Sequence, residues 1–278
     1  MNTLDPSKEI TGTVLILVPH MDDAVLACGG TLAQVTEKDG VHLLYATDGK
    51  GILHHEPAAA ARQHGEEAIG NVRRTETGRA LEVLGLPPNN VTFLDHPEWQ
   101  LANHADVLAG QIREAMRTVK PDTVLLPFRY DKHTDHVALH RIATRVLSEM
   151  DRPLTVLEYF VYYHWPLLPG GDIRRWIRDE YMSVVDIADV SEVKRRALDC
   201  FTSQTTCYFP WQPRPVLSDR LLNEYARGPE YLLRAGPTGR DRPLFRLPLP
   251  LLRLLHTAEP IIKNTKERLR GRLSRGKR

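Results

Sequence analysis

The most constraining feature of this chain is a run of five consecutive apolar residues near its start, Val14 to Val18, which ends at Pro19. A strand with one face in water alternates apolar and polar side chains, whereas an unbroken apolar run predicts a strand that is buried on both faces. Such strands are typical of parallel sheets whose faces are covered by crossover helices. The run therefore favours an α/β fold.

Strand and helix patterns alternate along the first 150 residues. Further strands are predicted at 41–46, 91–94 and 123–126, and helices over about 22–40, 65–84, 103–119 and 136–150. Beyond Pro153 the pattern loosens, with strands predicted at 156–163 and 182–187 and a helix at 191–201. Alternation of this kind predicts a mostly parallel sheet with crossover helices.

The composition predicts a globular protein with one large core. Hydrophobic residues make up 42% of the 278 residues and charged residues 26%, which excludes wholesale disorder and a multi-span membrane protein. No apolar run approaches the roughly 20 residues of a membrane-spanning helix, and no secretory signal opens the chain, so we expect a cytoplasmic protein. The odd set of Cys28, Cys200 and Cys207 argues against a disulfide framework and a thiolate zinc site.

Positive charge is concentrated at the C-terminus. Residues 253–278 contain nine Lys or Arg and two Glu, a net charge of +7, although the whole chain carries only +2. Basic residues beside an anionic membrane contribute about 1 kcal/mol each, so one interpretation is peripheral contact with the inner face of the membrane. The other is a solvated tail.

Ionisable residues follow three of the predicted strands. They are His20, Asp22 and Asp23 after the first strand, Asp95 after the third, and His133, Asp135 and His136 after the fourth. In parallel α/β sheets, ligands bind outside the carboxyl ends of the strands. We therefore expect a functional site at this edge of the sheet.

The spacing of these residues is compatible with a hydrolytic metal site. His20 and Asp23 can converge on one point at a helix start, and this leaves Asp22 directed at whatever is bound there. His136 could supply a third ligand and leave His133 free nearby, and a His2Asp set with an open position suits catalytic zinc. The alternatives are structural: either aspartate would be a helix N-cap, and either downstream histidine a surface or capping residue.

The spaced motifs resemble those of the PIG-L/LmbE-like zinc de-N-acetylases, whose signatures read P-H-P-D-D-E, a later G-G, and H-P-D-H. This chain has Pro19-His20-Met21-Asp22-Asp23, Gly29-Gly30-Thr31 and His133-Thr134-Asp135-His136, with supporting similarities at Arg73-x-x-Glu76, Phe93-Leu94-Asp95 and Ser203-Gln204. The resemblance spans roughly residues 13–205. Met21, Ala24 and Thr134 depart from the usual residues beside the motif positions.

The resemblance implies a Rossmann-like, three-layer α/β/α fold with a mostly parallel sheet and a smaller C-terminal extension. We expect residues 1–12 to form a lead-in and 13–205 the Rossmann-like deacetylase domain. Residues 206–250 would complete the domain irregularly, because they are rich in proline, and 251–278 would form the basic tail.

The resemblance also implies one divalent metal ion, usually Zn²⁺, and hydrolysis of an N-acetyl group on an amino sugar or its conjugate. By motif position, His20, Asp23 and His136 would be the metal ligands, and Asp22 the general base. His133 would protonate the leaving amine or stabilise the oxyanion, oriented by Asp135, while Arg73 would contact the sugar and Asp95 a substrate hydroxyl.

Two other functions remain open at this point. One is a metallohydrolase that acts on another amide or an ester, and the other is a metal-dependent sugar-binding protein without turnover. We expect a small-molecule or lipid-linked amino sugar as substrate and no nucleic acid as partner. The oligomeric state is left open.

Overall fold

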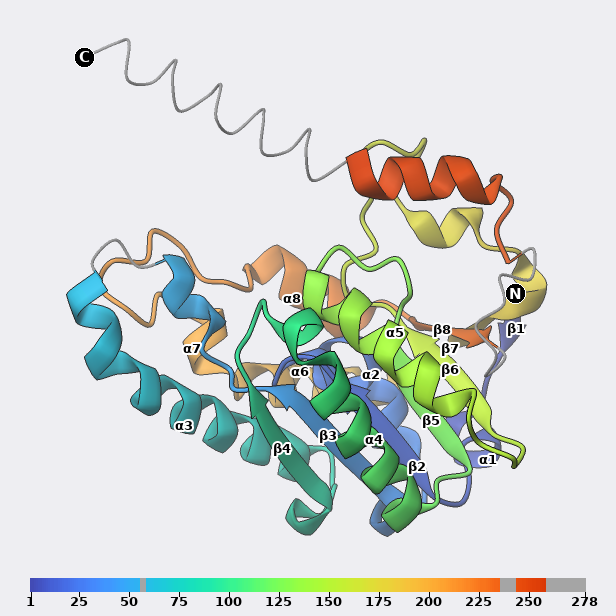
Figure 1. Cartoon of the computed structure of the whole chain (residues 1–278), viewed down its shortest axis with the longest axis horizontal. Helices are drawn as coiled ribbons and strands as arrows, with labels where there is room; N and C mark the ends of the chain where they lie inside the picture. Colours follow the sequence, from blue (N-terminus) through green and yellow to red (C-terminus); the bar gives the residue numbers. More distant parts are fainter. Residues whose placement is uncertain (56–58, 236–243, 259–278) are drawn as a thin grey trace.

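An eight-stranded sheet forms the middle layer of the molecule (Figure 1). The computed structural model describes residues 1–55, 59–235 and 244–258. The strands are β1 (Asn2–Thr3), β2 (Val14–Val18), β3 (Val41–Thr47), β4 (Val91–His96), β5 (Thr123–Pro127), β6 (Thr155–Tyr159), β7 (Met182–Val185) and β8 (Glu230–Ala235). The helices are α1 (Pro6–Glu9), α2 (Asp23–Gln34), α3 (Ala59–Val83), α4 (Ala105–Val119), α5 (Thr134–Leu147), α6 (Ser191–Asp199), α7 (Thr202–Thr205), α8 (Asp219–Arg227) and a further helix at 249–258.

The strand order across the sheet is β1-β7-β8-β6-β5-β2-β3-β4. Strand β8 is antiparallel to both of its neighbours, and the other strand pairs are parallel. The mostly parallel sheet and the α/β class predicted from the sequence are confirmed. Strand β8 and helix α8, which lie within 206–250, were not predicted.

The apolar run of β2 is explained by its central position between two cores. Leu15 and Leu17 belong to the core beneath α4 and α5, whereas Val14, Ile16 and Val18 belong to the core that α2, α3 and α6 help to form on the other side. In Figure 1, α4 and α5 lie on one face of the sheet and α2 and α6 on the other. Each residue of β2 is therefore buried, whichever layer it faces.

The Gly29-Gly30 pair has a packing function. A Cβ atom on Gly30 would lie 2.3 Å from Cγ2 of Ile187, so only glycine allows α2 to approach this segment. The carboxylate of Glu230 accepts hydrogen bonds from the backbone N–H groups of Gly30 and Thr31, each at 2.7 Å, and from Nζ of Lys194 at 2.7 Å. These contacts connect α2 and α6 to β8.

The chain reverses its direction of travel across the sheet between β2 and β5. These strands are neighbours, but β2 leads to β3 on one side and β5 leads to β6 on the other. A switch of this kind opens a crevice at the carboxyl ends of the two strands. The loops that follow β2 and β5 therefore meet at one place.

Part of the predicted basic tail can be described. Residues 249–258 are helical, and 259–278 lie outside the described residues. No helix in the described part of the chain is both long enough and apolar enough to cross a bilayer.

A buried ion pair holds the loop between β5 and α5. Arg129 donates from Nε to Oε1 of Glu158 at 3.0 Å and from its backbone N–H to Oε2 at 3.0 Å, while Nε2 of His140 lies 3.2 Å from Oε1. Burial alone would raise the pKa of Glu158, but His140 and Arg129 lower it from 4.5 to about 2. The carboxylate thus joins β6 to the loop and to α5.

We expect Glu158→Gln to lower the free energy of unfolding at pH 7 by about 3 kcal/mol, since each pKa unit corresponds to about 1.4 kcal/mol. Because the folded-state pKa is depressed, this contribution is present above about pH 4.5 and is lost as the pH falls towards 2. Denaturant titrations at several pH values test this, with Glu149→Gln, in an exposed pair with Arg113, as the control. Equal effects of the two variants would contradict the prediction.

Candidate metal centre

Two histidines and an aspartate place one donor atom each around a common point. His20 follows β2, Asp23 opens α2, and His136 lies in the first turn of α5. Oδ2 of Asp23 is 3.1 Å from Nδ1 of His20 and 3.0 Å from Nε2 of His136, and these two nitrogens are 3.1 Å apart. Tetrahedral ligands about 2.1 Å from zinc are separated by roughly 3.4 Å. The triangle therefore fits one divalent cation.

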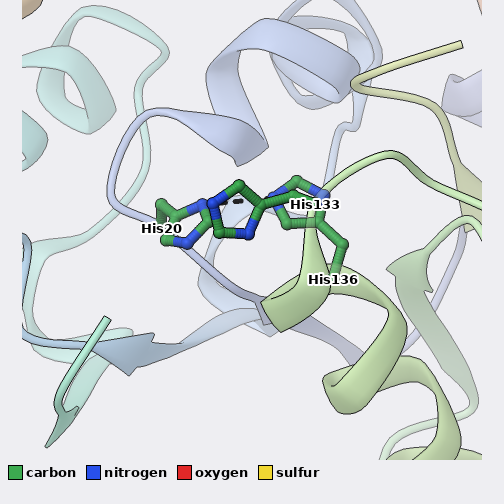
Figure 2. A group of neighbouring side chains, drawn as sticks. All are labelled: His20, His133 and His136. Carbon is green, nitrogen blue, oxygen red and sulfur yellow. Dashed lines mark hydrogen bonds between the residues drawn. The ribbon is translucent and has the colours of Figure 1, made fainter. Parts of the chain in front are cut away.

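His133 adds a third imidazole to this cluster. Figure 2 shows its ring beside those of His20 and His136, and one ring nitrogen from each lies within 4.8 Å of the others. Nδ1 of His133 accepts the backbone N–H of Asp135 at 3.2 Å, as the N-cap of α5. A neutral ring in this arrangement carries its proton on Nε2. The capping alternative is thus correct for His133, but the cap leaves Nε2 available.

Asp135 contacts His20 with its carboxylate and His133 with its backbone N–H. Its carboxylate Oδ2 lies 3.3 Å from Nε2 of His20 but 4.0 Å from Nδ1 of His133. The same carboxylate accepts the backbone N–H groups of Trp99 at 2.6 Å and Leu101 at 3.2 Å. The side chain therefore orients His20, and the contact with His133 comes from the backbone N–H of Asp135.

Asp131 is a further member of the site that the sequence did not reveal. Its Oδ2 lies 3.3 Å from Nδ1 of His136, the nitrogen opposite the donor triangle, and its Oδ1 accepts the backbone N–H of His133 at 2.9 Å. The carboxylate also accepts the backbone N–H of Tyr162. Metal-ligating histidines are usually oriented by a carboxylate or carbonyl in this way. The signal that the sequence offered for Asp131 was its position, two residues before the predicted site residue His133.

The electrostatics of the cluster favour positive charge at its centre. Burial alone would lower the pKa of His136, but the carboxylates of Asp131 and Asp23 raise it to about 9. Burial alone would lower the pKa of His20, but the carboxylates of Asp23 and Asp135 raise it well above its usual value. Burial and the two neighbouring histidines lower the pKa of His133 to about 2. The carboxylates thus favour a cation in the triangle, and His133 is a neutral ring beside it.

Asp22 lies at the N-cap position of α2, but its side chain makes no cap hydrogen bond. Its Oδ1 accepts from Nη2 of Arg73 at 2.7 Å, and Nη1 of this arginine lies 3.7 Å from Oε1 of Glu98. The N-cap alternative is therefore wrong for the Asp22 carboxylate. Arg73, predicted to contact a sugar, is 4% exposed and holds Asp22 in place.

The Asp95 side chain contacts Arg74 and none of the residues of the donor triangle among the described contacts. Its carboxylate forms an ion pair with Arg74, and its backbone has a φ of +59° at the end of β4. Strand β4 is one of the two edge strands of the sheet, and β3 separates it from β2. The structure therefore does not bring Asp95 into the group formed by the other predicted site residues.

Trp99 covers one side of His133. The two ring centroids are 4.1 Å apart, and the indole is 47% exposed. Its φ of +68° is rare for a bulky residue and costs about 1–3 kcal/mol, which the surrounding structure must offset. The hydrogen bond from the backbone N–H of Trp99 to Asp135 helps to offset this conformational cost. No periodic pattern in the sequence marked this residue.

Known proteins of one family match this chain. Residues 15–147 match the PIG-L family, described as GlcNAc-PI de-N-acetylase. A probable N-acetyl-α-D-glucosaminyl L-malate deacetylase 2 from Bacillus cereus is 26% identical over 69% of this chain and 83% of its own length. 2′-N-acetylparomamine deacetylase from Streptomyces fradiae is 28% identical over 70% of this chain and 74% of its own length. The structure of N,N′-diacetylchitobiose deacetylase from Pyrococcus horikoshii aligns with this one with a TM-score of 0.57. The sequence identity is 19%, and the alignment covers 85% of this chain and 88% of that chain.

We expect His136→Ala to abolish binding of Zn²⁺ and Asp131→Asn to weaken it about 10- to 100-fold, because Asp131 orients a ligand without being one. Competition titrations against a chromophoric chelator measure both effects. Asp106→Asn, at an exposed position on α4, is the matched control and should bind as the wild type does. Wild-type affinity in His136→Ala would contradict the assignment of the site.

Proposed function

We propose that this chain, which belongs to the PIG-L family, is a metal-dependent hydrolase that removes an N-acetyl group from an amino-sugar substrate. The observation that carries the proposal is the triangle of donor atoms from His20, Asp23 and His136. The carboxylate of Asp22, the residue before Asp23, makes no N-cap hydrogen bond. The names of the relatives support the substrate class, since those proteins are deacetylases of N-acetylglucosaminyl malate and acetylparomamine.

The proposed metal ligands are His20, Asp23 and His136, a set of two nitrogens and one oxygen that suits zinc. When bound, a divalent ion supplies a Lewis acid that polarises a carbonyl and lowers the pKa of water. Asp131 and Asp135 orient His136 and His20 from the outside, through the ring nitrogens that do not face the triangle.

Asp22 is the proposed general base. Its Oδ1 is held by Arg73, and no hydrogen bond reaches Oδ2 among the described residues, so that oxygen is available to a water. In the proposed reaction, Asp22 takes a proton from the attacking water and then gives it to the amide nitrogen as the C–N bond breaks. Acetic acid and a free amine result, the Asp22 carboxylate is regenerated, and the acid then loses its proton to the amine or to solvent.

His133 is proposed to stabilise the negative oxygen that develops on the carbonyl. Burial and the neighbouring histidines keep its pKa low, at about 2, so the ring acts as a neutral donor through Nε2–H. This favours the oxyanion role over protonation of the amine. The substrate contacts that we propose remain Arg73, which borders Asp22, and Asp95 at the end of β4.

Acetate release from a panel of N-acetylated amino sugars tests the proposal. We expect release from at least one of them, loss of release after chelation, and recovery when Zn²⁺ is returned. O-acetylated sugars and N-acetylated amino acids in the same panel would reveal an esterase or another amidase. Saturable sugar binding without acetate release would instead identify a non-catalytic binding protein.

We expect Asp22→Asn to lower kcat by about 10²-fold or more, a typical general-base contribution, while the stoichiometry of bound metal stays unchanged. Steady-state kinetics together with metal analysis measure both quantities. Asp39→Asn, an exposed change outside the site, is the control. Unchanged turnover in a fully metallated Asp22→Asn protein would remove Asp22 from this role.

A further inference from the structure

Trp99 presents an open indole beside the candidate metal centre. The side chain is 47% exposed, whereas Trp165 is buried and Trp176 and Trp211 are half-buried. One side of the indole packs against the ring of His133, with 4.1 Å between the ring centroids, and nearly half of the side chain still meets solvent. Tryptophan side chains are on average highly buried, so an indole left open at this place calls for an explanation.

The backbone of Trp99 has a conformation that a bulky side chain disfavours. Its φ of +68° lies in the left-handed region. The backbone N–H donates to the carboxylate of Asp135 at 2.6 Å, and this carboxylate also lies 3.3 Å from Nε2 of His20. Glycine would adopt this conformation without strain, so the turn itself does not require tryptophan. Strained residues of this kind cluster at ligand sites, which directs attention to the indole.

The indole lies close to the donor triangle. The ring of His133 contacts both, since its centroid is 4.4 Å from that of His20 and 4.1 Å from that of Trp99. The Nε1 edge of the indole extends towards the loop after β3, where a Cβ atom on Gly51 would be 3.3 Å away. In an N-acetylated amino sugar, only the amide nitrogen separates the carbonyl carbon from the sugar ring. A substrate with its carbonyl at the triangle would therefore have its ring near the indole.

We propose that Trp99 is a specificity-determining residue, whose indole stacks on the sugar ring that carries the acetamido group. This inference rests on the proposed function and extends it, because it assigns the site to cyclic substrates. One face of a pyranose ring presents C–H groups, and these pack on an aromatic face as other apolar groups do. An acyclic N-acetylated amine has the same amide but lacks this face. The indole therefore favours the sugar over the acyclic amine.

The competing explanation is that Trp99 only positions His133. The two roles differ in what they change. A contact that is equally strong in the bound substrate and in the transition state lowers KM and leaves kcat unchanged. Loss of the position of His133 would instead lower kcat, and it would do so whether the substrate is cyclic or not. The kinetic parameter that responds to removal of the indole separates the two roles.

Binding of glucosamine, the product of the simplest amino-sugar substrate, to the Zn²⁺-loaded full-length protein tests the proposal by calorimetry. We expect Trp99→Gly to bind it about 10-fold more weakly, a loss comparable to that of an aromatic side chain that stacks on a nucleic-acid base. Trp99→Phe, which keeps an aromatic face, should retain most of the affinity. Trp176→Ala is the matched control, because this half-buried tryptophan lies between β6 and β7, and it should bind as the wild type does.

Trp99→Gly is suited to this test because glycine accepts the positive φ, so the variant should keep its fold and its bound metal. Far-UV circular dichroism and metal analysis measure both. With N-acetylglucosamine as substrate, we expect Trp99→Gly to raise KM about 10-fold with little change in kcat. The affinity for N-acetylethanolamine, an acyclic amide, should be the same in Trp99→Gly as in the wild type.

Two results would overturn the proposal. One is glucosamine binding that is equal in Trp99→Gly and the wild type, or absent from both. The other is an equal loss of affinity for the sugar and for the acyclic amide. The proposed hydrolysis is tested separately by acetate release: a protein that binds glucosamine through Trp99 and releases no acetate would refute the hydrolysis and leave the stacking assignment intact. Acetate release with no effect of Trp99→Gly on sugar affinity would do the reverse.

Discussion

The parallel pairing of β2 with β5 is the constraint on which the candidate site depends. It places the carboxyl ends of these strands side by side, so that Asp23 and His136, more than 100 positions apart in the sequence, come within 3.0 Å. Burying ionisable groups at such a point is costly unless each finds a partner. Here the two carboxylates outside the triangle, Asp131 and Asp135, also fix His136 and His20, so the same contacts stabilise and orient the centre.

Most of the sheet and helix pattern could be predicted because it depends on local sequence. The continuous apolar run of β2 and the strand-helix alternation that follows it were sufficient for the α/β class. Strand β8 escaped prediction because it begins with Glu230, a charge that would ordinarily indicate solvent. Only the long-range contacts of Glu230 with α2 and Lys194 explain why this carboxylate is buried.

The candidate site was less accessible to sequence reasoning, since strand order decides which strand ends meet. The motif positions of His20, Asp23 and His136 do meet, and His133 lies beside them. Asp95 also follows a parallel strand, but that strand is at the sheet edge. Asp131 and Trp99 reach the histidines through loop conformation, which spacing alone does not encode.

The alternation of β2 side chains between the two cores limits how chains of this type can vary in length. A strand has a side-chain period of two, so inserting or deleting a single residue between Val14 and Val18 would exchange the layers that its side chains face. It would also displace His20 relative to the end of β5. Length variation among related chains should therefore be tolerated at the opposite, amino-terminal edge of the sheet and be rare in the segment that leads from β2 into α2.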